Sequence, residues 1–237
     1  MADGAAIAAS GMHADMQRIA IISQNLSNVL TPGYKRLWPV AAGFGALMAP
    51  DTGSPAAGIE TSTDFRSAPS RRTGNVLDLA IEGEGYFVLQ DAAGALTYTR
   101  QGRFMLDANG RLVAPGGLAV AGVSGEIRLE SDQPRIDRSG RIFDRDTLLG
   151  QIRLQRFDDP HRLAPAGPGR YAQGTASPGQ AGESVRIRQG HVEASNVIPA
   201  DEMVRLIETM RRFEGGQKVI QWYDDMLEQA LSRLGQY

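Results

Sequence analysis

The sequence contains no cysteine and only three histidines among its 237 residues. The absence of cysteine excludes disulfides, zinc–thiolate sites, iron–sulfur clusters and a cysteine nucleophile. A formal net charge of −2 leaves no basic excess for binding nucleic acid. No apolar run is long enough to predict a transmembrane helix, and the first residues lack the basic region of a cleaved secretory signal peptide.

Glycine, in contrast, is abundant. The chain has 28 glycines and only 6% aromatic residues, a composition typical of turn-rich β-structure. The glycines are unevenly distributed, because residues 5–31 contain only Gly11 whereas residues 60–195 hold most of the turns and short β-like runs. This contrast predicts helical ends around a central β-domain.

An amphipathic helix is predicted near the N-terminus. Seven of eight positions spaced alternately by three and four residues are apolar, which is the heptad spacing of a helix–helix seam. Thr31-Pro32-Gly33 ends this helix, because proline has no amide donor and glycine tolerates positive φ. The seam positions are Ala5, Ala8, Met12, Asp15, Ile19, Ile22, Leu26 and Val29.

A longer helix is predicted at the C-terminal end. Pro199 suits a first helical turn, and Asp201 and Glu202 follow where the helix dipole favours negative charge. Residues 199–234 would form a helix of about 54 Å, a length usual for coiled coils and bundles. Gly215–Gly216 interrupts it, and we expect a bend or a close helix contact there. The seam positions are Met203, Leu206, Met210, Phe213, Gln217, Ile220, Asp224, Leu227, Leu231 and Leu234.

The middle of the chain has the pattern of short antiparallel strands. Asp107–Gly110 predicts a tight hairpin, since Asn-Gly supplies the positive φ values, and Asp137–Gly140 repeats the pattern more weakly. We therefore expect two similar hairpins in an α+β fold whose terminal helices pack as a coiled coil or helical bundle. Its expected parts are an N-terminal helix and turn over 1–33, a linker or arm over 34–60, a mainly antiparallel β-domain over 61–195 and a C-terminal helix over 196–237.

The sequence shows no convincing catalytic, cofactor-binding or metal site. It has no nucleophile elbow, zinc-protease helix or phosphate-binding loop motif. The pairs Asp158–Asp159 and Asp224–Asp225 are neighbours whose side chains point apart on a strand or helix, so they are poor acid–base pairs. His191 and Glu193 could supply two metal ligands, but a polar strand edge is the favoured interpretation. We therefore expect no enzyme and no cofactor. The helical seams indicate either the core of a small monomeric subdomain or, favoured by their length and terminal position, assembly contacts.

Asn25–Arg36, Thr73–Phe87 and Glu193–Val197 are three stretches that resemble motifs of the bacterial flagellar rod and hook protein family. Asn25–Arg36 contains the N-L-x-N-x-x-T-x-G-[FY]-[KR] pattern that ends the family's N-terminal helix. Thr73–Phe87 resembles the family's T-G-x-x-L-D-x-A-I-x-G-x-G-[FY]-F entry into the β-domain and is followed by a matching run over Tyr98–Phe104. Glu193–Val197, which leads into the C-terminal helix, is the third match. The three occur along the chain in the family's order.

The resemblance implies an axial subunit of the periplasm-spanning basal-body rod, which transmits torque and forms the wall of the export channel. In this family the terminal helices of many copies pack into concentric tubes around the channel, with the β-domain outside them. The implied partners are further copies, other rod and hook axial proteins and the flagellar type III export apparatus, which acts without signal cleavage. The implied assembly contacts are Met12, Ile19, Ile22, Asn25, Leu26, Asn28, Thr31, Gly33, Met203, Leu206, Met210, Phe213, Ile220, Leu227 and Leu231.

The resemblance favours a proximal-rod protein. Hook subunits usually carry a further β-domain, and the distal rod protein, which is the alternative, usually has a longer segment after the first motif. Two other classes stay open: a peptidoglycan-interacting module and a soluble coiled-coil adaptor. The former needs an acidic–aromatic groove, whereas Trp38 and Trp222 both lie outside the predicted β-domain.

Overall fold

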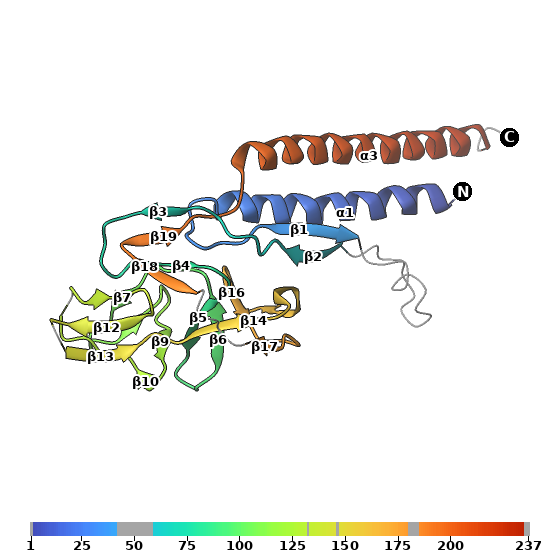
Figure 1. Ribbon diagram of the computed structural model, residues 1–237. Coiled ribbons are helices and arrows are strands. Elements are labelled where there is room, and N and C mark those ends of the chain that lie inside the picture. The colour runs from blue at the N-terminus through green and yellow to red at the C-terminus, as the bar shows by residue number, and fades with distance from the viewer. Residues whose placement is uncertain (1, 42–58, 132, 146, 180–184, 235–237) are drawn as a thin grey trace. The chain divides into compact units, whose positions relative to one another are not determined.

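The computed structural model describes every residue except 1, 42–58, 132, 146, 180–184 and 235–237 (Figure 1). The described residues form two α-helices, α1 (Ala2–Ser27) and α3 (Pro199–Leu234), and short strands whose pairs are antiparallel. The fold is therefore α+β, as predicted. The chain divides into two compact units: unit 1 comprises Met1–Ser27, Leu37–Asp64 and Val197–Tyr237, and unit 2 comprises Asn28–Arg36 and Phe65–Asn196.

Unit 1 consists of the two helices and a β-hairpin. The helices α1 and α3 lie side by side and antiparallel (Figure 1). Strands β1 (Leu37–Ala41) and β2 (Ile59–Thr63) pair antiparallel, and the pair packs against α1. The segment predicted as a linker or arm, residues 34–60, thus includes β1 and the start of β2, while residues 42–58 lie outside the described part of the chain.

The long C-terminal helix follows its sequence signals closely. It begins at Pro199, as predicted, with Asp201 and Glu202 in its first turn, where the unpaired amides of a helix N-terminus favour acidic side chains. The helix continues through Gly215–Gly216 to Leu234. Two adjacent glycines cost about 1 kcal/mol each relative to alanine in a helix interior, so the surrounding turns and the packing of unit 1 must offset that cost.

Unit 2 is the β-domain. Its largest sheet contains the strand path β15-β16-β6-β5-β9-β8-β7, and β14 and β10 pair with β5 and β9. Smaller sheets have the orders β11-β12-β13, β18-β4 and β19-β3, and β17 pairs with β14. The strands are β3 (Ser70–Arg72), β4 (Leu79–Glu82), β5 (Tyr86–Gln90), β6 (Leu96–Thr99), β7 (Met105–Leu106), β8 (Leu112–Val113), β9 (Ala119–Gly122), β10 (Gly125–Glu126), β11 (Arg135–Ile136), β12 (Arg141–Asp144), β13 (Thr147–Gln151), β14 (Leu154–Phe157), β15 (Ala164–Pro165), β16 (Arg170–Ala172), β17 (Pro178–Gly179), β18 (Arg186–Gln189) and β19 (His191–Glu193), with a short 3-10 helix at Pro160–Arg162.

Strand β5 separates two hydrophobic clusters of unit 2. Because successive side chains of a strand point to opposite faces, Phe87 and Leu89 enter an aliphatic cluster, while Tyr86 and Val88 enter an aromatic one. All four are buried. Burial raises the pKa of Tyr86 to about 12, although the nearby charge of Arg100 acts in the opposite direction. The alternating pattern of one strand therefore fills both cores.

The two predicted hairpins are confirmed, and their turns have the same hydrogen-bond pattern. In Asp107–Gly110 and Asp137–Gly140, the aspartate carboxylate accepts the backbone N–H groups two and four residues later over 2.8–3.0 Å, and the glycine has positive φ. Hydrogen bonds from the backbone and side chain of Arg111 lower the pKa of Asp107 below its usual value. A third copy begins at Asp91, with bonds of 2.9 and 2.8 Å. This third turn was not predicted from the sequence.

Candidate functional site

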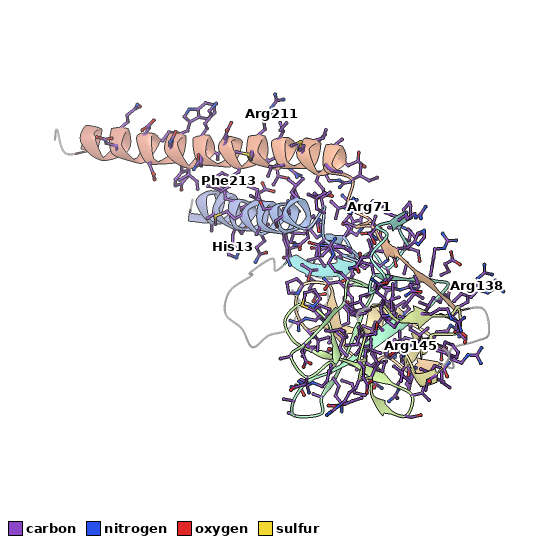
Figure 2. The ribbon with its side chains drawn as sticks, turned by 90° about the vertical axis from the view of Figure 1, so that its left-hand side faces the viewer. His13, Arg71, Arg138, Arg145, Arg211 and Phe213 are labelled. Atoms are coloured by element: carbon purple, nitrogen blue, oxygen red, sulfur yellow. The ribbon has the colours of Figure 1, made fainter. Side chains whose placement is uncertain are left out.

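The helix pair of unit 1 is packed along a stripe of α3 whose members are spaced alternately by four and three residues. This spacing keeps them on one face of the helix. Figure 2 shows Phe213 on the side of α3 toward α1 and Arg211 on the opposite side. The stripe of buried and half-buried residues consists of Glu202, Leu206, Thr209, Phe213, Gly216, Ile220 and Tyr223.

The predicted contact residues of α3 divide between this stripe and the exposed surface. Leu206, Phe213 and Ile220 are half-buried on the stripe. Met203 and Met210 instead remain 58% and 48% exposed. The predicted residues therefore occupy two faces of α3, and only one of them is covered within unit 1. The side chains of the two remaining predicted residues, Leu227 and Leu231, lie outside what the structure describes.

Polar residues hold two positions of the stripe. Thr209 is buried, and its hydroxyl donates to the Arg205 carbonyl over 2.7 Å. Glu202 is also buried, and its Oε2 accepts from Asn25 over 3.2 Å. A polar group can be buried at little cost when it is hydrogen-bonded, so these residues replace the methionines next to them in the packed face. Apolar periodicity alone does not identify such positions.

The predicted residues of α1 lie on its packed side. Ile22 is buried, and Met12, Ile19 and Leu26 are half-buried. Met12 lies directly against α3, because a Cβ built on Gly216 would be 2.8 Å from the Met12 Cγ. That separation is shorter than an ordinary carbon–carbon contact of about 3.5–4.0 Å. The close helix contact predicted at the glycine pair is therefore confirmed.

Asn25 joins three elements of unit 1. Its amide oxygen accepts the Leu37 N–H, and its amide nitrogen donates to the Leu37 carbonyl, both over 2.9 Å. The same nitrogen donates to Glu202, so one side chain of α1 contacts the start of β1 and the first turn of α3. The guanidinium of Arg205 lies 4.8 Å from the centre of the Trp38 ring and provides a direct contact between α3 and β1. Asn25 thus satisfies backbone and side-chain polar groups from the other two elements.

The turn after α1 contains the other predicted residues. The Thr31 hydroxyl donates to Asn28 Oδ1 over 3.1 Å, and both side chains are half-buried. Gly33 has a φ of 66°, and its N–H donates to the Glu193 carbonyl over 2.8 Å. A Cβ on Gly33 would overlap the backbone carbonyl of Arg100. Both the backbone angle and the available space therefore require glycine here.

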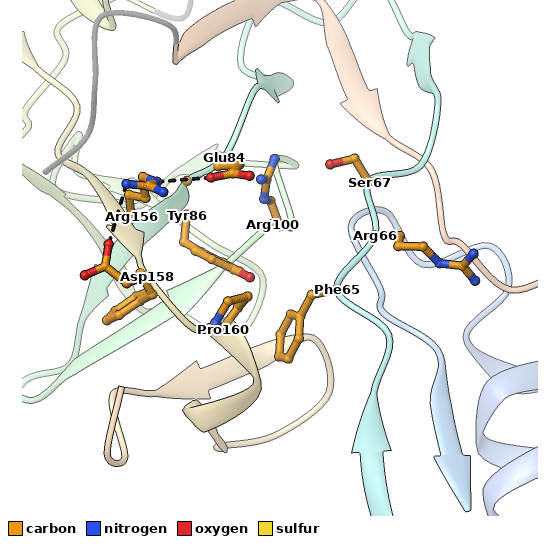
Figure 3. Close-up of a pocket in the computed structure, with 11 residues that line it drawn as sticks. Phe65, Arg66, Ser67, Glu84, Tyr86, Arg100, Arg156, Asp158 and Pro160 are labelled. Carbon is orange, nitrogen blue, oxygen red and sulfur yellow. Dashed lines mark hydrogen bonds and ion pairs between the residues drawn. The ribbon is translucent and has the colours of Figure 1, made fainter. Parts of the chain in front are cut away.

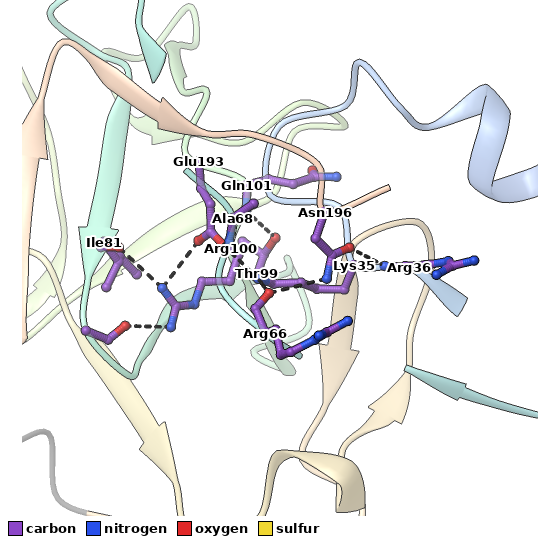
Figure 4. A network of polar contacts seen from close by, with 11 residues as sticks. Lys35, Arg36, Arg66, Ala68, Ile81, Thr99, Arg100, Gln101, Glu193 and Asn196 are labelled. Atoms are coloured by element: carbon purple, nitrogen blue, oxygen red, sulfur yellow. Dashed lines mark hydrogen bonds and ion pairs between the residues drawn. The ribbon is translucent and has the colours of Figure 1, made fainter. Parts of the chain in front are cut away.

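Lys35, Glu193 and Arg100 form a buried ion network in unit 2 (Figure 4). Lys35 Nζ donates to Glu193 Oε1 over 2.7 Å, and Arg100 Nη1 donates to Oε2 over 3.3 Å. The three side chains are only 1%, 3% and 6% exposed in that order. The Ala68 N–H also donates to Oε1 over 2.9 Å, and Lys35 Nζ donates to the Arg66 carbonyl over 2.8 Å. Removal of these charges from water is thus compensated by direct partners.

The sequence pattern did not predict this network. It suggested Glu193 and His191 as two metal ligands and favoured a polar strand edge. The His191 Nδ1 instead lies 2.9 Å from the Gln189 carbonyl oxygen, while the Glu193 carboxylate binds cations from two distant segments. The available signal was that Lys35, Arg100 and Glu193 each lie within one of the three motif matches.

Arg100 also lines a pocket of about 240 Å³ in unit 2 (Figure 3). Arg156 also lines this pocket and pairs with Glu84 over 3.0 Å and with Asp158 over 3.5 Å. The two carboxylates thus contact a guanidinium, and the described lining contains no histidine that could act as a base. This arrangement does not favour acid–base or nucleophilic chemistry. The remaining lining residues are Phe65, Arg66, Ser67, Gly85, Tyr86, Phe157 and Pro160.

Comparison with known proteins decides the family. The chain matches "Flagella basal body rod protein" over residues 6–35, "Flagellar hook protein FlgE/F/G D1 domain" over 80–143 and "Flagellar basal body rod FlgEFG protein C-terminal" over 188–233. The flagellar basal-body rod protein FlgG of Buchnera aphidicola subsp. Acyrthosiphon pisum is 34% identical over 260 residues, which cover 96% of this chain and 98% of the relative. The chain belongs to the flagellar basal-body rod protein family.

Other rod proteins match over similar shares of their length. The FlgF rod protein of Caulobacter vibrioides is 30% identical and covers 92% of each chain. The FlgF rod protein of Mesorhizobium japonicum is also 30% identical and covers 99% of each chain. The family resemblance stated from the motifs is therefore confirmed along the whole chain.

In this rod protein, the buried network joins the three matched regions. Lys35 is the last residue of the first match, Arg100 lies in the second and Glu193 in the third. Their side chains meet in unit 2, although 158 residues separate Lys35 from Glu193. The family motifs thus contribute to one junction in the fold rather than to three separate features.

The rod family is structural and not enzymatic, which agrees with the interpretation of the sequence. Within the described ranges, no three histidine, aspartate or glutamate side chains are grouped so that they could hold a metal ion. Neither described helix combines the length and the apolar character needed to cross a membrane.

Proposed function

We propose that this rod protein polymerises through α1 and α3 into the proximal part of the flagellar basal-body rod, where it transmits torque and forms part of the export-channel wall. The observation that carries the proposal is the apolar surface that α3 leaves exposed. Contiguous exposed apolar patches mark interaction sites in otherwise soluble proteins. Neighbouring subunits are the partners that would cover this surface.

Six of the large apolar residues that α3 exposes form two groups on different sides of the helix, and Val204, which is also exposed, belongs to neither group. One group occupies the first half of α3, and the other occupies the second half on the opposite flank of the buried stripe, as the rotation of about 100° per residue requires. Trp222 is 71% exposed, and tryptophan is a frequent anchor of interfaces. Two separate apolar groups are better suited to contacts with two neighbouring subunits than with one. The groups are Met203, Ile207 and Met210, and Val219, Trp222 and Met226.

The helices of neighbouring copies are proposed to pack as coiled coils. Heptad spacing supports this packing, and contacts between unlike faces build an open-ended rod when the rotation from copy to copy does not close into a ring. In this proposal residues 1–33 form the N-terminal assembly helix and turn, and residues 34–60 form a linker or arm. Residues 61–195 form the β-domain outside the helical tubes, and residues 196–237 form the C-terminal assembly helix. The predicted contact residues of α1, of the following turn and of α3 keep their proposed roles at the interfaces between copies.

The proposed partners are further copies, other axial proteins of the rod and hook, and the flagellar export apparatus, which would deliver the chain without signal cleavage. The short segment that follows the first motif supports a proximal position. The alignment with the Mesorhizobium FlgF protein is 243 residues long and covers 99% of this chain. The alignment with the Buchnera FlgG protein is longer, at 260 residues, and covers 96% of this chain. A distal position is the alternative. Labelling the subunit in images of intact basal bodies would distinguish the two.

Glutamate substitutions on the exposed face test the assembly proposal. Because Met203 and Met210 are exposed, the double variant Met203→Glu/Met210→Glu should keep the helical circular dichroism of the purified monomer. Burying two carboxylates between subunits is costly, so cells carrying this variant should form no rods and should not swim. Arg211→Glu is the control, since it places the same side chain at an outward position of α3 that is already charged. Normal swimming by the double variant would contradict the proposal.

A further inference from the structure

The chain passes between the two units four times, after residues 27, 36, 64 and 196. Three segments of unit 2 adjoin these crossings: residues 28–36, 65–68 and 193–196. Any force that passes along the chain between the units must pass through these segments. What holds the three segments to one another therefore decides how such a force is distributed.

The Glu193 carboxylate contacts all of these segments. It belongs to the third segment, its Oε1 accepts from Lys35 of the first over 2.7 Å, and the same oxygen accepts the Ala68 N–H of the second over 2.9 Å. Lys35 Nζ extends the connection to the Arg66 carbonyl over 2.8 Å. One buried carboxylate thus links three stretches that are distant in sequence.

Arg100 anchors the carboxylate to the body of the β-domain. Its Nη1 donates to Glu193 Oε2 over 3.3 Å, and its Nη2 donates to the Gly83 carbonyl, between β4 and β5, over 2.7 Å. The two oxygens of Glu193 therefore have different tasks, since Oε1 binds the crossing segments and Oε2 binds the sheet. Hydrogen bonds to charged groups are among the stronger ones in proteins, particularly in a buried site.

Asn196 reinforces the connection between the segments. Its N–H donates to the Tyr34 carbonyl over 3.3 Å, and its Oδ1 accepts the Arg36 N–H over 2.7 Å. Its Nδ2 donates to the Arg66 carbonyl over 3.3 Å. The first and third segments are thus joined by backbone and side-chain bonds. Residues 66–68 are joined to them by the side chains of Glu193, Lys35 and Asn196, and directly after them the Ala194 N–H donates to the Pro69 carbonyl over 3.0 Å.

We propose that Glu193 is a positioning residue that clamps the three crossing segments to one another and to the β-domain. In a rotating rod, the clamp makes the crossings share the load, so that no single crossing is extended alone. The load-sharing part rests on the proposed function. The clamp itself does not, because it is a property of the isolated chain.

Hydrogen exchange on the purified full-length protein tests the clamp. Glu193→Gln keeps the shape of the side chain but removes the charge that binds Lys35 and Arg100. Amides of the crossing segments, such as those of Arg36 and Ala68, should then exchange about tenfold faster or more, while the Leu89 amide in β5 keeps its rate. Wild-type rates at the crossings in the folded variant would overturn the clamp, and so would an equal acceleration at Leu89.

Two further variants keep the test decisive. Lys35→Met removes only one of the two cations that bind Glu193. Amide exchange should therefore accelerate over residues 28–36, while the Ala68 N–H keeps its bond to the carboxylate. This variant tests the clamp if Glu193→Gln does not fold. Glu84→Gln is the matched control, because it removes an exposed, Arg156-paired carboxylate of the same unit and should leave all crossing amides unchanged.

Swimming under load tests the second part of the proposal. Cells carrying Glu193→Gln should swim at normal speed in dilute medium and lose speed more steeply than wild type as viscosity rises. Equal speeds at every viscosity, or complete loss of swimming at every viscosity, would overturn load sharing. Normal swimming by Met203→Glu/Met210→Glu would refute the proposed function separately, without affecting the exchange result.

Discussion

The glycine pair in α3 offers a sharp test of the α1–α3 contact, because its two members have different surroundings. Apart from its two chain neighbours and the nearby backbone of α3 itself, no described atom lies within 4 Å of a Cβ built on Gly215, whereas a Cβ on Gly216 meets Met12 at 2.8 Å. Both residues lie inside a helix, where alanine is favoured over glycine by about 1 kcal/mol. Gly215→Ala should therefore stabilise unit 1 by about 1 kcal/mol.

Gly216→Ala should gain the same helix propensity and lose much of it again. Met12 Cγ must move by about 0.7 Å or more to reach an ordinary contact distance, and overpacking of this kind typically costs about 1–3 kcal/mol. Because methionine is flexible, we expect the low end of that range, which leaves a net change near zero. The two alanine variants should thus differ by about 1 kcal/mol.

A double-mutant cycle isolates the contact from the general effect of alanine. In a Met12→Ala background the obstruction is gone, so Gly216→Ala should recover the full gain of about 1 kcal/mol. The assay is urea or thermal unfolding followed by helical circular dichroism, where 1 kcal/mol corresponds to about 2–4 °C for a chain of this size. Equal stabilisation by Gly215→Ala and Gly216→Ala in the Met12 background would refute the packing of Met12 on α3.

Three other predictions concern unit 2. Gly33→Ala should destabilise it by at least about 1–2 kcal/mol in urea unfolding, because alanine resists the left-handed backbone and its Cβ overlaps the Arg100 carbonyl; an unchanged midpoint would contradict this. Lys35→Met should cost about 3–5 kcal/mol by the same assay, since the buried Glu193 charge loses a partner, and a loss below 1 kcal/mol would show that the pair is not desolvated. The lowered pKa of Asp107 means that its contribution is complete above the unfolded value of about 3.9 and is lost as pH falls through the folded pKa. The stability deficit of Asp107→Asn should therefore be present at pH 7 and shrink below about pH 4, and a deficit independent of pH would refute the ionic contribution.

Local sequence patterns predicted the two helices and two of the hairpins correctly. Pro199 and the acids after it predicted the start of α3, and Asn109-Gly110 predicted a hairpin turn, because both signals act through the backbone of a few adjacent residues. The strand β1 was not predicted, since Leu37–Ala41 contains Pro39 and has no alternating pattern. Its pairing with β2 involves a partner about twenty residues away, which local propensity does not specify.

The candidate site was only partly predictable. Asn25, Gly33 and Ile22 were identified because the turn motif and the apolar spacing marked them, and the structure packs all three. Met203 and Glu202 show the limit of that method. Periodicity selected the apolar methionine, but the glutamate is the buried residue, because a hydrogen bond from Asn25 satisfies one of its oxygens.

The sequence by itself determined the helical ends, the turn-rich middle without cysteine or catalytic motifs, and the rod family. These features depend on composition, short-range periodicity and ordered motifs, which can be recognised in the sequence without knowledge of the tertiary structure. Only the tertiary structure decided which face of α3 is covered and that Lys35, Arg100 and Glu193 share one buried site. The physical reason is that burial and ion pairing depend on groups brought together by the fold, and no local pattern records the partner of a charge 158 residues away.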